Sequence, residues 1–191
     1  MPAKMITAVQ LIPHRASSDD YTLAEHLKAH FAQMKRERHP LYLTLDEFDR
    51  VLQWKLRGQY GRQRGRRKAN TDEVVRIVTG AALSIEHPDK HYEIELRLGI
   101  LCTLRGVDVP VASAILALVF PERYAVIDFR GWRQVFGEDR TAFSISDYKR
   151  YLREIQKLAQ ELKWPVQEVD LAIWEYDRIN GRKAVATTAA G

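Results

Sequence analysis

Hydrophobic side chains recur every three or four residues through most of the chain, which is the spacing of one face of an α-helix. The first such stretch follows the Ser and Asp residues at 17–20, a favourable helix start, and is closed by Pro40. A second begins at Thr44, where the letters TLDE form a capping box, and a third restarts at Thr71. These patterns predict three helices in the first half of the chain.

The second half continues the helical pattern with one sharp interruption. A helix is predicted from about Asp89 to near Cys102, followed by a tight turn and a strongly apolar helix that ends near residue 120. A short link follows, and Ser144 or Ser146 caps a long helix. Pro165 separates this helix from the last one. The chain is therefore expected to be all-α.

The predicted domain organisation has three parts. Residues 1–18 form an N-terminal arm, within which the apolar letters at 5–12 fit a short strand or an extended segment. Residues 19–178 form one helical domain, since 191 residues with 46% hydrophobic content suffice for one sizeable core. Residues 179–191 have little to bury and are expected to be a disordered tail.

Composition narrows the class of protein. No apolar run approaches the roughly 20 residues that a membrane helix needs, and the N-terminus lacks the features of a signal peptide. Cys102 is the only cysteine, which excludes an internal disulfide and a four-cysteine iron–sulfur cluster within one chain. His26 and His30 lie one turn apart, but no second pair accompanies them, so no metal site is expected. These features predict a cytoplasmic protein without a membrane partner.

Positive charge is concentrated in one segment. The chain has 30 basic and 25 acidic residues, but residues 55–68, KLRGQYGRQRGRRK, hold seven basic residues and no acid. The remainder, with 23 basic residues, is slightly acidic. A local excess of arginine threaded with glycine suits a phosphate backbone, so DNA contacts are expected there, with a solvated loop as the alternative. The expected contacts are Arg62, Arg64, Arg66, Arg67 and Lys68.

The turn between the two central helices can bind phosphate through its main chain. The chain turns through Gly106 and then enters a helix with Pro110 in its first turn, where the missing N–H costs nothing. Backbone N–H groups at such a turn form an anion site that is blind to base sequence. The predicted contacts are Arg105, Gly106, Val107, Asp108 and Val109.

Sixteen positions after Ala112, Asp128 follows the apolar letters YAVI and precedes Arg130 and Trp132. A hairpin LRGVD with a following apolar helix, and then an element VIDFR, resembles the helix-hairpin-helix DNA glycosylase superfamily. Residues 54–55, the stretch from GVDVP to FRGW, and VDLAIWEY near the end resemble its bacterial 8-oxoguanine-glycosylase-like branch. The resemblance covers roughly Leu43 to Tyr176 and implies a helix-hairpin-helix glycosylase-like bundle with Asp128 as its catalytic carboxylate.

Two departures from the superfamily pattern bear on the reaction. Asp108 replaces the second hairpin glycine, at a position that often needs a left-handed backbone, and its carboxylate must point away from phosphate or weaken the clamp. Strand-cleaving members carry a lysine nucleophile where this chain has Pro110. The resemblance therefore implies a monofunctional glycosylase that leaves an abasic site. Lys55 is predicted to contact phosphate, or to replace the absent lysine in a glycosylase with lyase activity.

The implied chemistry needs no cofactor. Cleavage of the bond between sugar and base develops positive charge on the sugar, which a carboxylate stabilises, and the base must first flip into a pocket. Candidates for the pocket are Trp54, Trp132, Asp170 and Trp174. Burial in the core is the alternative for Trp54 and Trp174, and a salt bridge within the fold is the alternative for Asp170. Arg130 is a candidate DNA contact.

The sequence leaves open both the identity of the base and the class of function. The base is an oxidised guanine, an alkylated base, or a bulky modified base of foreign DNA such as phage DNA, so repair and antiviral defence are both compatible with the sequence. A non-catalytic DNA-binding module that uses the same hairpin is the second class of function. A monomer acting on DNA is expected in either case.

Overall fold

The computed structural model describes residues 6–15 and 19–188, and within these ranges the chain forms helices and connecting segments without a β-strand. The predicted all-α class is confirmed for this part of the chain. The helices are α1 (Ala8–Leu11), α2 (Asp19–Glu37), α3 (Leu45–Leu56), α4 (Arg64–Arg67), α5 (Asp72–Ser84), α6 (Lys90–Leu101), α7 (Val109–Val119), α8 (Phe129–Phe136), α9 (Ile145–Leu162) and α10 (Val166–Thr188), with the 3₁₀ segments η1 (Ile12–His14) and η2 (Arg57–Gln63).

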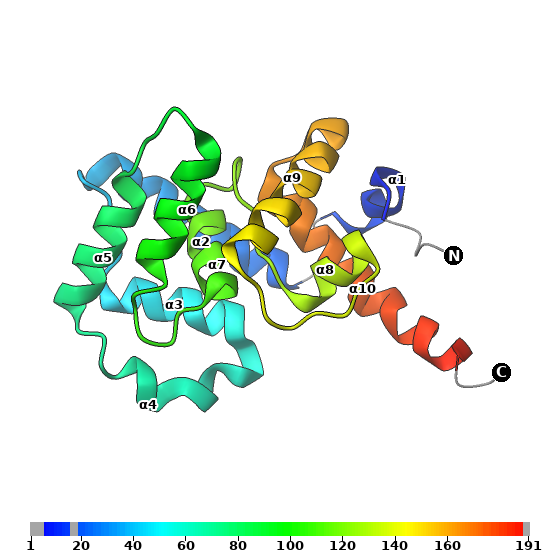
Figure 1. The fold of residues 1–191 in the computed structure, drawn as a ribbon, viewed down its shortest axis with the longest axis horizontal. Helices are drawn as coiled ribbons and strands as arrows, with labels where there is room; N and C mark the ends of the chain where they lie inside the picture. Colours follow the sequence, from blue (N-terminus) through cyan, green and yellow to red (C-terminus); the bar gives the residue numbers. More distant parts are fainter. Residues whose placement is uncertain (1–5, 16–18, 189–191) are drawn as a thin grey trace.

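The helices form two groups that lie side by side (Figure 1). In one group α5 packs on α6, and α7 packs on α2, α3 and α6. In the other, α10 packs on α1, α8 and α9. Contacts of α10 with α7 and of α9 with α6 join the groups. No helix in the described ranges is long and apolar enough to cross a membrane.

Local sequence explains where most of the helices begin. A Ser, Thr or Asp in extended conformation precedes each of them, and its side chain accepts hydrogen bonds from backbone N–H groups of the first turn, which otherwise have no partner. Thr44 and Ser144 also form full capping boxes with Glu47 and Asp147. The capping residues are Thr44, Thr71, Asp89, Asp108, Asp128 and Ser144.

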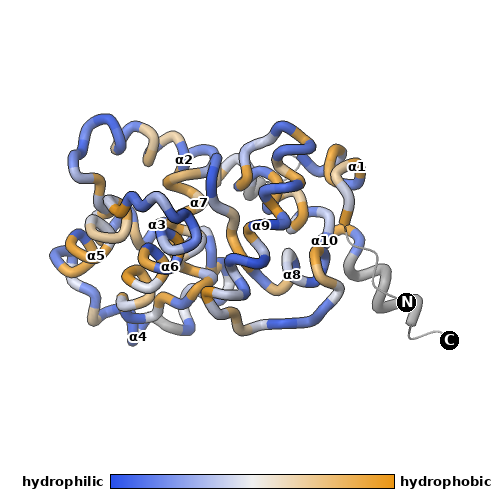
Figure 2. Tube along the Cα trace, turned by 45° about the horizontal axis from the view of Figure 1, so that its top comes forward, coloured by the Kyte–Doolittle hydropathy of each residue, from blue (hydrophilic) through white to orange (hydrophobic). Residues whose placement is uncertain are grey.

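Helix α7 is the centre of the core. Every residue from Val111 to Val119 is buried, as is Val109, because helices of both groups cover its surface. The other long helices alternate between hydrophobic and hydrophilic positions, and the connecting loops are mostly hydrophilic (Figure 2). A helix that is apolar on all sides belongs in a core, and this one holds the hairpin at its N-terminus rigidly in place.

The extended link between α7 and α8 crosses from one group to the other. Buried side chains from both groups hold its backbone: the Ile127 N–H donates to Ser113 Oγ (3.1 Å), and the Ala125 carbonyl accepts from the Tyr148 hydroxyl (3.0 Å). Because these partners are buried, the residue that ends the link, Asp128, has a fixed position.

The two ends of the domain differ from the predicted organisation. Residues 8–14 are helical rather than extended, because Thr7 caps α1 through Gln10 and the short helix packs on α10. Backbone helix continues in α10 to Thr188, past residue 179, where the predicted tail begins. The hydrophobic pattern does not show this extension, since residues beyond Asn180 have few large apolar side chains.

Candidate active site

Asp128 is the N-cap of α8, at the N-terminal end of a helix as the sequence predicts. One carboxylate oxygen, Oδ1, accepts from the N–H groups of Arg130 (3.0 Å) and Gly131 (2.9 Å). The other, Oδ2, lies 3.9 Å from Lys55 Nζ. The side chain is 23% exposed, so one oxygen orients the carboxylate while the other remains accessible.

Lys55 reaches Asp128 from the last turn of α3. Its ammonium group donates to the Ile127 carbonyl (3.2 Å), and its side chain is 11% exposed. The carbonyl fixes the position of the ammonium beside the carboxylate. The structure thus pairs two charged candidates that lie far apart in the sequence.

Asp128 and Lys55 line a cleft of about 610 Å³. The first turn of α7 contributes Asp108, Pro110 and Val111 to the same cleft. The start of α7, directly after the hairpin, and the candidate carboxylate therefore face one space, and Lys55 borders it together with Pro110. The remaining lining residues are Leu56, Arg57, Gly58, Gln59, Phe129, Arg130, Thr141, Phe143 and Trp174.

A smaller cavity of about 40 Å³ adjoins Asp128 and is lined by three of the four candidate pocket residues, Trp54, Asp170 and Trp174. Asp170 accepts from the Val126 N–H (2.5 Å), and burial raises the pKa of its carboxyl group well above the ordinary value. The indole N–H of Trp54 is buried and has no hydrogen-bond partner. The cavity therefore combines aromatic faces with polar groups, as sites for planar ligands do.

Trp132 does not belong to this pocket, and its prediction as a pocket residue is wrong. The side chain is fully buried, and its ring lies 4.3 Å from that of Phe136 and 5.5 Å from that of Phe143, centroid to centroid. Trp132 lies one helical turn after Asp128, on the face that α8 turns to the core. The periodicity of α8 thus makes it a core residue.

The hairpin after α6 is a four-residue turn closed by a hydrogen bond from the Val107 N–H to the Leu104 carbonyl (3.1 Å). Gly106 has φ 78°, a conformation that glycine adopts without steric cost. Asp108, by contrast, is extended (φ −111°), which corrects the expected left-handed backbone. Its carboxylate accepts from the Val111 N–H (3.1 Å) and caps α7, so it stays beside the N–H groups that were expected to bind phosphate.

This geometry changes which main-chain groups can bind phosphate. The N–H groups of Arg105, Val107 and Val111 already have acceptors within the protein. Within the described residues, the N–H groups of Gly106, Asp108 and Val109 have none besides solvent. Of the predicted clamp, Arg105 and Val107 can thus contribute only side chains, and an anion must bind next to the Asp108 carboxylate.

Asn70 holds the hairpin and was not found from the sequence. Its side-chain amide donates to the Arg105 carbonyl (2.8 Å) and its amide oxygen accepts from the Arg105 N–H (3.0 Å). Asn70 is 5% exposed. A buried asparagine just before a helix start carries no recognisable sequence signal, because the same residue type is common in surface turns.

The basic segment lies beside the hairpin. Gly65, Arg66 and Ala69 share a groove of about 600 Å³ with residues 102–107. The side chains of Arg62, Arg64, Arg66 and Lys68 are exposed, which is compatible with the predicted backbone contacts. Cys102 also lines the groove, where burial, and to a lesser degree Asp108, raise the pKa of its thiol to about 11. The thiol stays protonated and is a poor nucleophile.

Two of the predicted DNA contacts have partners within the protein. Arg67 is 8% exposed, donates to the Tyr60 carbonyl and stacks on the Tyr60 ring at 4.1 Å, so its prediction as a phosphate contact is wrong. Arg130 pairs with the fully buried Asp177 (2.9 Å) and retains 28% exposure. It therefore anchors α8 on α10, with only part of its guanidinium available to a ligand.

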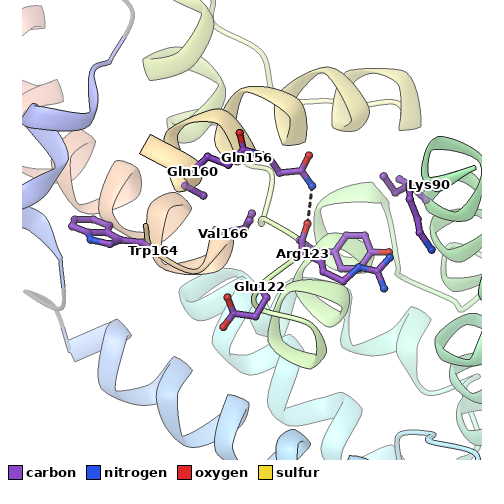
Figure 3. A pocket seen from close by; sticks show the side chains of 10 residues that line it. Lys90, Glu122, Arg123, Gln156, Gln160, Trp164 and Val166 are labelled. Carbon is purple, nitrogen blue, oxygen red and sulfur yellow. Dashed lines mark hydrogen bonds between the residues drawn. The ribbon is translucent and has the colours of Figure 1, made fainter. Parts of the chain in front are cut away.

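A second pocket, of about 400 Å³, lies at the other end of the link and shares no lining residue with the cleft at Asp128 (Figure 3). Its cations Lys90 and Arg123 both pair with Glu93, which is fully buried. The Arg123 carbonyl accepts from Gln156. Both cations of this pocket are thus engaged in ion pairs within the fold, and the candidate chemistry stays with Asp128.

Comparison with models of known families, with curated proteins and with solved structures finds no match to this chain.

Proposed function

We propose that this protein is a monofunctional DNA glycosylase with a helix-hairpin-helix glycosylase-like fold, acting as a cytoplasmic monomer on a modified base flipped out of DNA. The observation that carries the proposal is the shared cleft. The first turn of the helix that follows the hairpin, an oriented carboxylate and an aromatic cavity border one space. A protein that only held DNA would gain nothing from a carboxylate facing phosphates.

Asp128 is the catalytic residue of this proposal. Its Oδ1 is fixed by two backbone N–H groups, which leaves Oδ2 to face the sugar of the flipped nucleotide. As the bond between sugar and base breaks, positive charge develops on the sugar and the carboxylate stabilises it. Water then attacks the sugar carbon, its proton passes to the carboxylate or to solvent, and the base leaves with the bonding electron pair.

The remaining residues bind the DNA. The free N–H groups of Gly106, Asp108 and Val109 take one phosphate, and the exposed arginines of residues 62–66 take others. The flipped base lies against Trp174, with Trp54 and Asp170 at its edge. Phe129, 43% exposed at the start of α8, lies at the mouth of the cleft.

The test is base release from a panel of duplexes that carry oxidised, alkylated and bulky modified bases, together with phage genomic DNAs. Alkali after the incubation converts abasic sites into strand breaks. The proposal predicts breaks that depend on alkali with at least one substrate. Tight binding of duplex DNA without release of any base would instead support the non-catalytic binding module.

A second candidate, glycosylase with lyase activity, is favoured by the position of Lys55. Its amine lies 3.9 Å from Asp128 and borders the same cleft as Pro110, the position of the lysine in strand-cleaving relatives. A lyase forms a Schiff base that borohydride traps as a covalent protein–DNA adduct. Trapping that Lys55→Gln abolishes would establish this candidate, and strand breaks that require alkali would exclude it.

A further inference from the structure

The face of Trp174 that a flipped base would use is already covered. The guanidinium carbon of Arg57 lies 4.0 Å from the centre of the Trp174 ring, which is stacking distance. Arg130 approaches the same ring at 5.3 Å, but the ion pair with Asp177 anchors it. Arg57 thus lies where a planar ligand would lie.

The free space at this point is too small for a base. The cavity of about 40 Å³ has room for about one water molecule, whereas a cavity known to hold benzene measures about 150 Å³. Four residues line both the cavity and the larger cleft: Lys55, Arg57, Asp128 and Trp174. These four residues form the boundary between the cleft and the cavity. A base in the cleft can enter the cavity only if one of them moves.

Arg57 is the member of this boundary best placed to move. It is an exposed residue at the junction between α3 and η2, directly before Gly58. Its backbone has φ 47° and ψ −122°, a strained conformation for a residue other than glycine. Lys55, Asp128 and Trp174 are each less exposed than Arg57.

We propose that the Arg57 guanidinium occupies the ligand position on Trp174 in the free protein and that a flat aromatic base displaces it. This inference rests on the proposed function for the identity of the ligand. The displaced guanidinium lies at the cleft mouth, where it can pair with a DNA phosphate. A base with a saturated, puckered ring stacks poorly on indole, so the site selects planar bases.

Occlusion is tested without DNA, by acrylamide quenching of tryptophan fluorescence. Arg57→Ala is compared with Arg62→Ala, which removes the same charge from an exposed position of the same segment. Arg57→Ala should raise the quenching constant above that of Arg62→Ala, and the difference should vanish when Trp174→Phe is added to both. Arg57→Gly repeats the test without steric strain at φ 47°. Equal quenching in the Arg57 and Arg62 variants would overturn the proposal.

Displacement is tested with a duplex that carries 2-aminopurine opposite an abasic-site analogue. Arg57→Ala should bind it about two- to fivefold more tightly than the unmodified protein does, the factor that corresponds to losing one exposed cation–π contact before binding. A duplex with dihydrothymine at the same place should show no such gain. Equal or weaker binding of the aminopurine duplex by Arg57→Ala would overturn displacement. If Trp174 is exposed as expected but no variant binds DNA, the occlusion stands and the proposed function fails.

Discussion

Asp108 and Asp128 occupy equivalent local positions and differ in what surrounds them. Each is an extended N-cap whose carboxylate accepts from the first turn of its helix, and each lines the same cleft. Asp108 is exposed and bonds one N–H group, that of Val111. Asp128 is less exposed and bonds two, with Lys55 at 3.9 Å from its second oxygen.

The difference shows that a capping motif alone does not determine the surroundings of its carboxylate. Asp128 gains its surroundings from segments far away in the chain: Lys55 from α3, and Asp170 and Trp174 from α10. Asp108 has the hairpin beside it, and its charge opposes a phosphate there. Local sequence therefore predicts both caps equally well, and only the packing places a lysine, a second aspartate and a tryptophan beside Asp128.

The largest expected effect comes from the anchor of α8. Asp177 is fully buried and binds Arg130, Arg133 and Gln134, so Asp177→Asn leaves two guanidinium groups partly unpaired. We expect the free energy of unfolding to fall by about 3 kcal/mol. Urea unfolding measures the loss, and hydrogen exchange should show faster exchange in α8 than in α7.

Glu175→Gln is the matched control, because Glu175 lies on the same helix but pairs with Arg178, which is 53% exposed. Glu175 itself is buried, but water can reach the guanidinium that loses its partner, so the loss should be clearly smaller than that of Asp177→Asn. Equal losses in the two variants would mean that Asp177 is not the anchor that holds the Asp128 region.

A smaller effect is expected at Gly131, whose N–H donates to Asp128. A Cβ atom there would lie 2.3 Å from the Tyr151 hydroxyl oxygen, and Tyr151 is buried. Gly131→Ala should destabilise the protein by about 2 kcal/mol through overpacking. Adding Tyr151→Phe removes that oxygen and should restore part of the loss, as a double-mutant cycle in thermal unfolding would show. Strict additivity would contradict the proposed clash.

In the hairpin that precedes Asp108, Asn70→Ala tests whether the turn depends on the two hydrogen bonds between the Asn70 side chain and the Arg105 backbone. The change leaves the N–H and carbonyl of Arg105 without their protein partner. Because Arg105 is exposed, water can reach part of its backbone, and the expected loss in the free energy of unfolding is about 1 kcal/mol. Amide exchange at Val107 should accelerate while exchange at Gly131 stays unchanged. Faster exchange at both sites would show that the two regions are not independent.

The smallest expected effect on stability comes from the basic segment, residues 55–68, where the changes should act on DNA binding. Arg62, Arg64 and Arg66 are exposed and Arg67 is buried. Removing one arginine–phosphate interaction should lower the log–log salt slope of duplex binding by about 0.9, so the triple Ala variant should lower it by about 2.7. Arg67→Ala should reduce stability and leave the slope unchanged. If Arg67→Ala lowered the salt slope and the triple variant did not, the phosphate contact would belong to Arg67 rather than to the three exposed arginines.

Much of the fold follows from local sequence. Helix starts at Thr44, Thr71, Asp89 and Ser144, and the turn at Gly106, follow from capping and backbone preferences that need no tertiary information. The helices at residues 8–14 and beyond residue 179 do not follow. They depend on an N-terminal Thr–Gln cap, on packing against α10 and on a helix that continues without large apolar residues.

The site was predictable only in part. Asp128, Lys55, Trp54, Asp170 and Trp174 line the cleft or its cavity, as the sequence and its resemblance indicate. Local pattern does not distinguish Trp174, which lines the cavity, from Trp132, which is a core residue, since both lie on amphipathic helices. Burial of one arginine among exposed ones, and the roles of Asn70 and Asp177, arise from contacts between distant segments.

The central claim is tested most directly by single-turnover base release with Asp128→Asn, on the duplex that the panel identifies, with Asp108→Asn as the matched control. Asn caps a helix about as well as Asp, so both variants should unfold like the unmodified protein. Asp128→Asn should slow base release by about 10²–10³-fold without weakening DNA binding, because it removes a charge needed in the transition state. Asp108→Asn should stay within a few-fold of the unmodified rate. Asp128→Asn that folds, binds DNA and releases the base at nearly the unmodified rate would contradict the account.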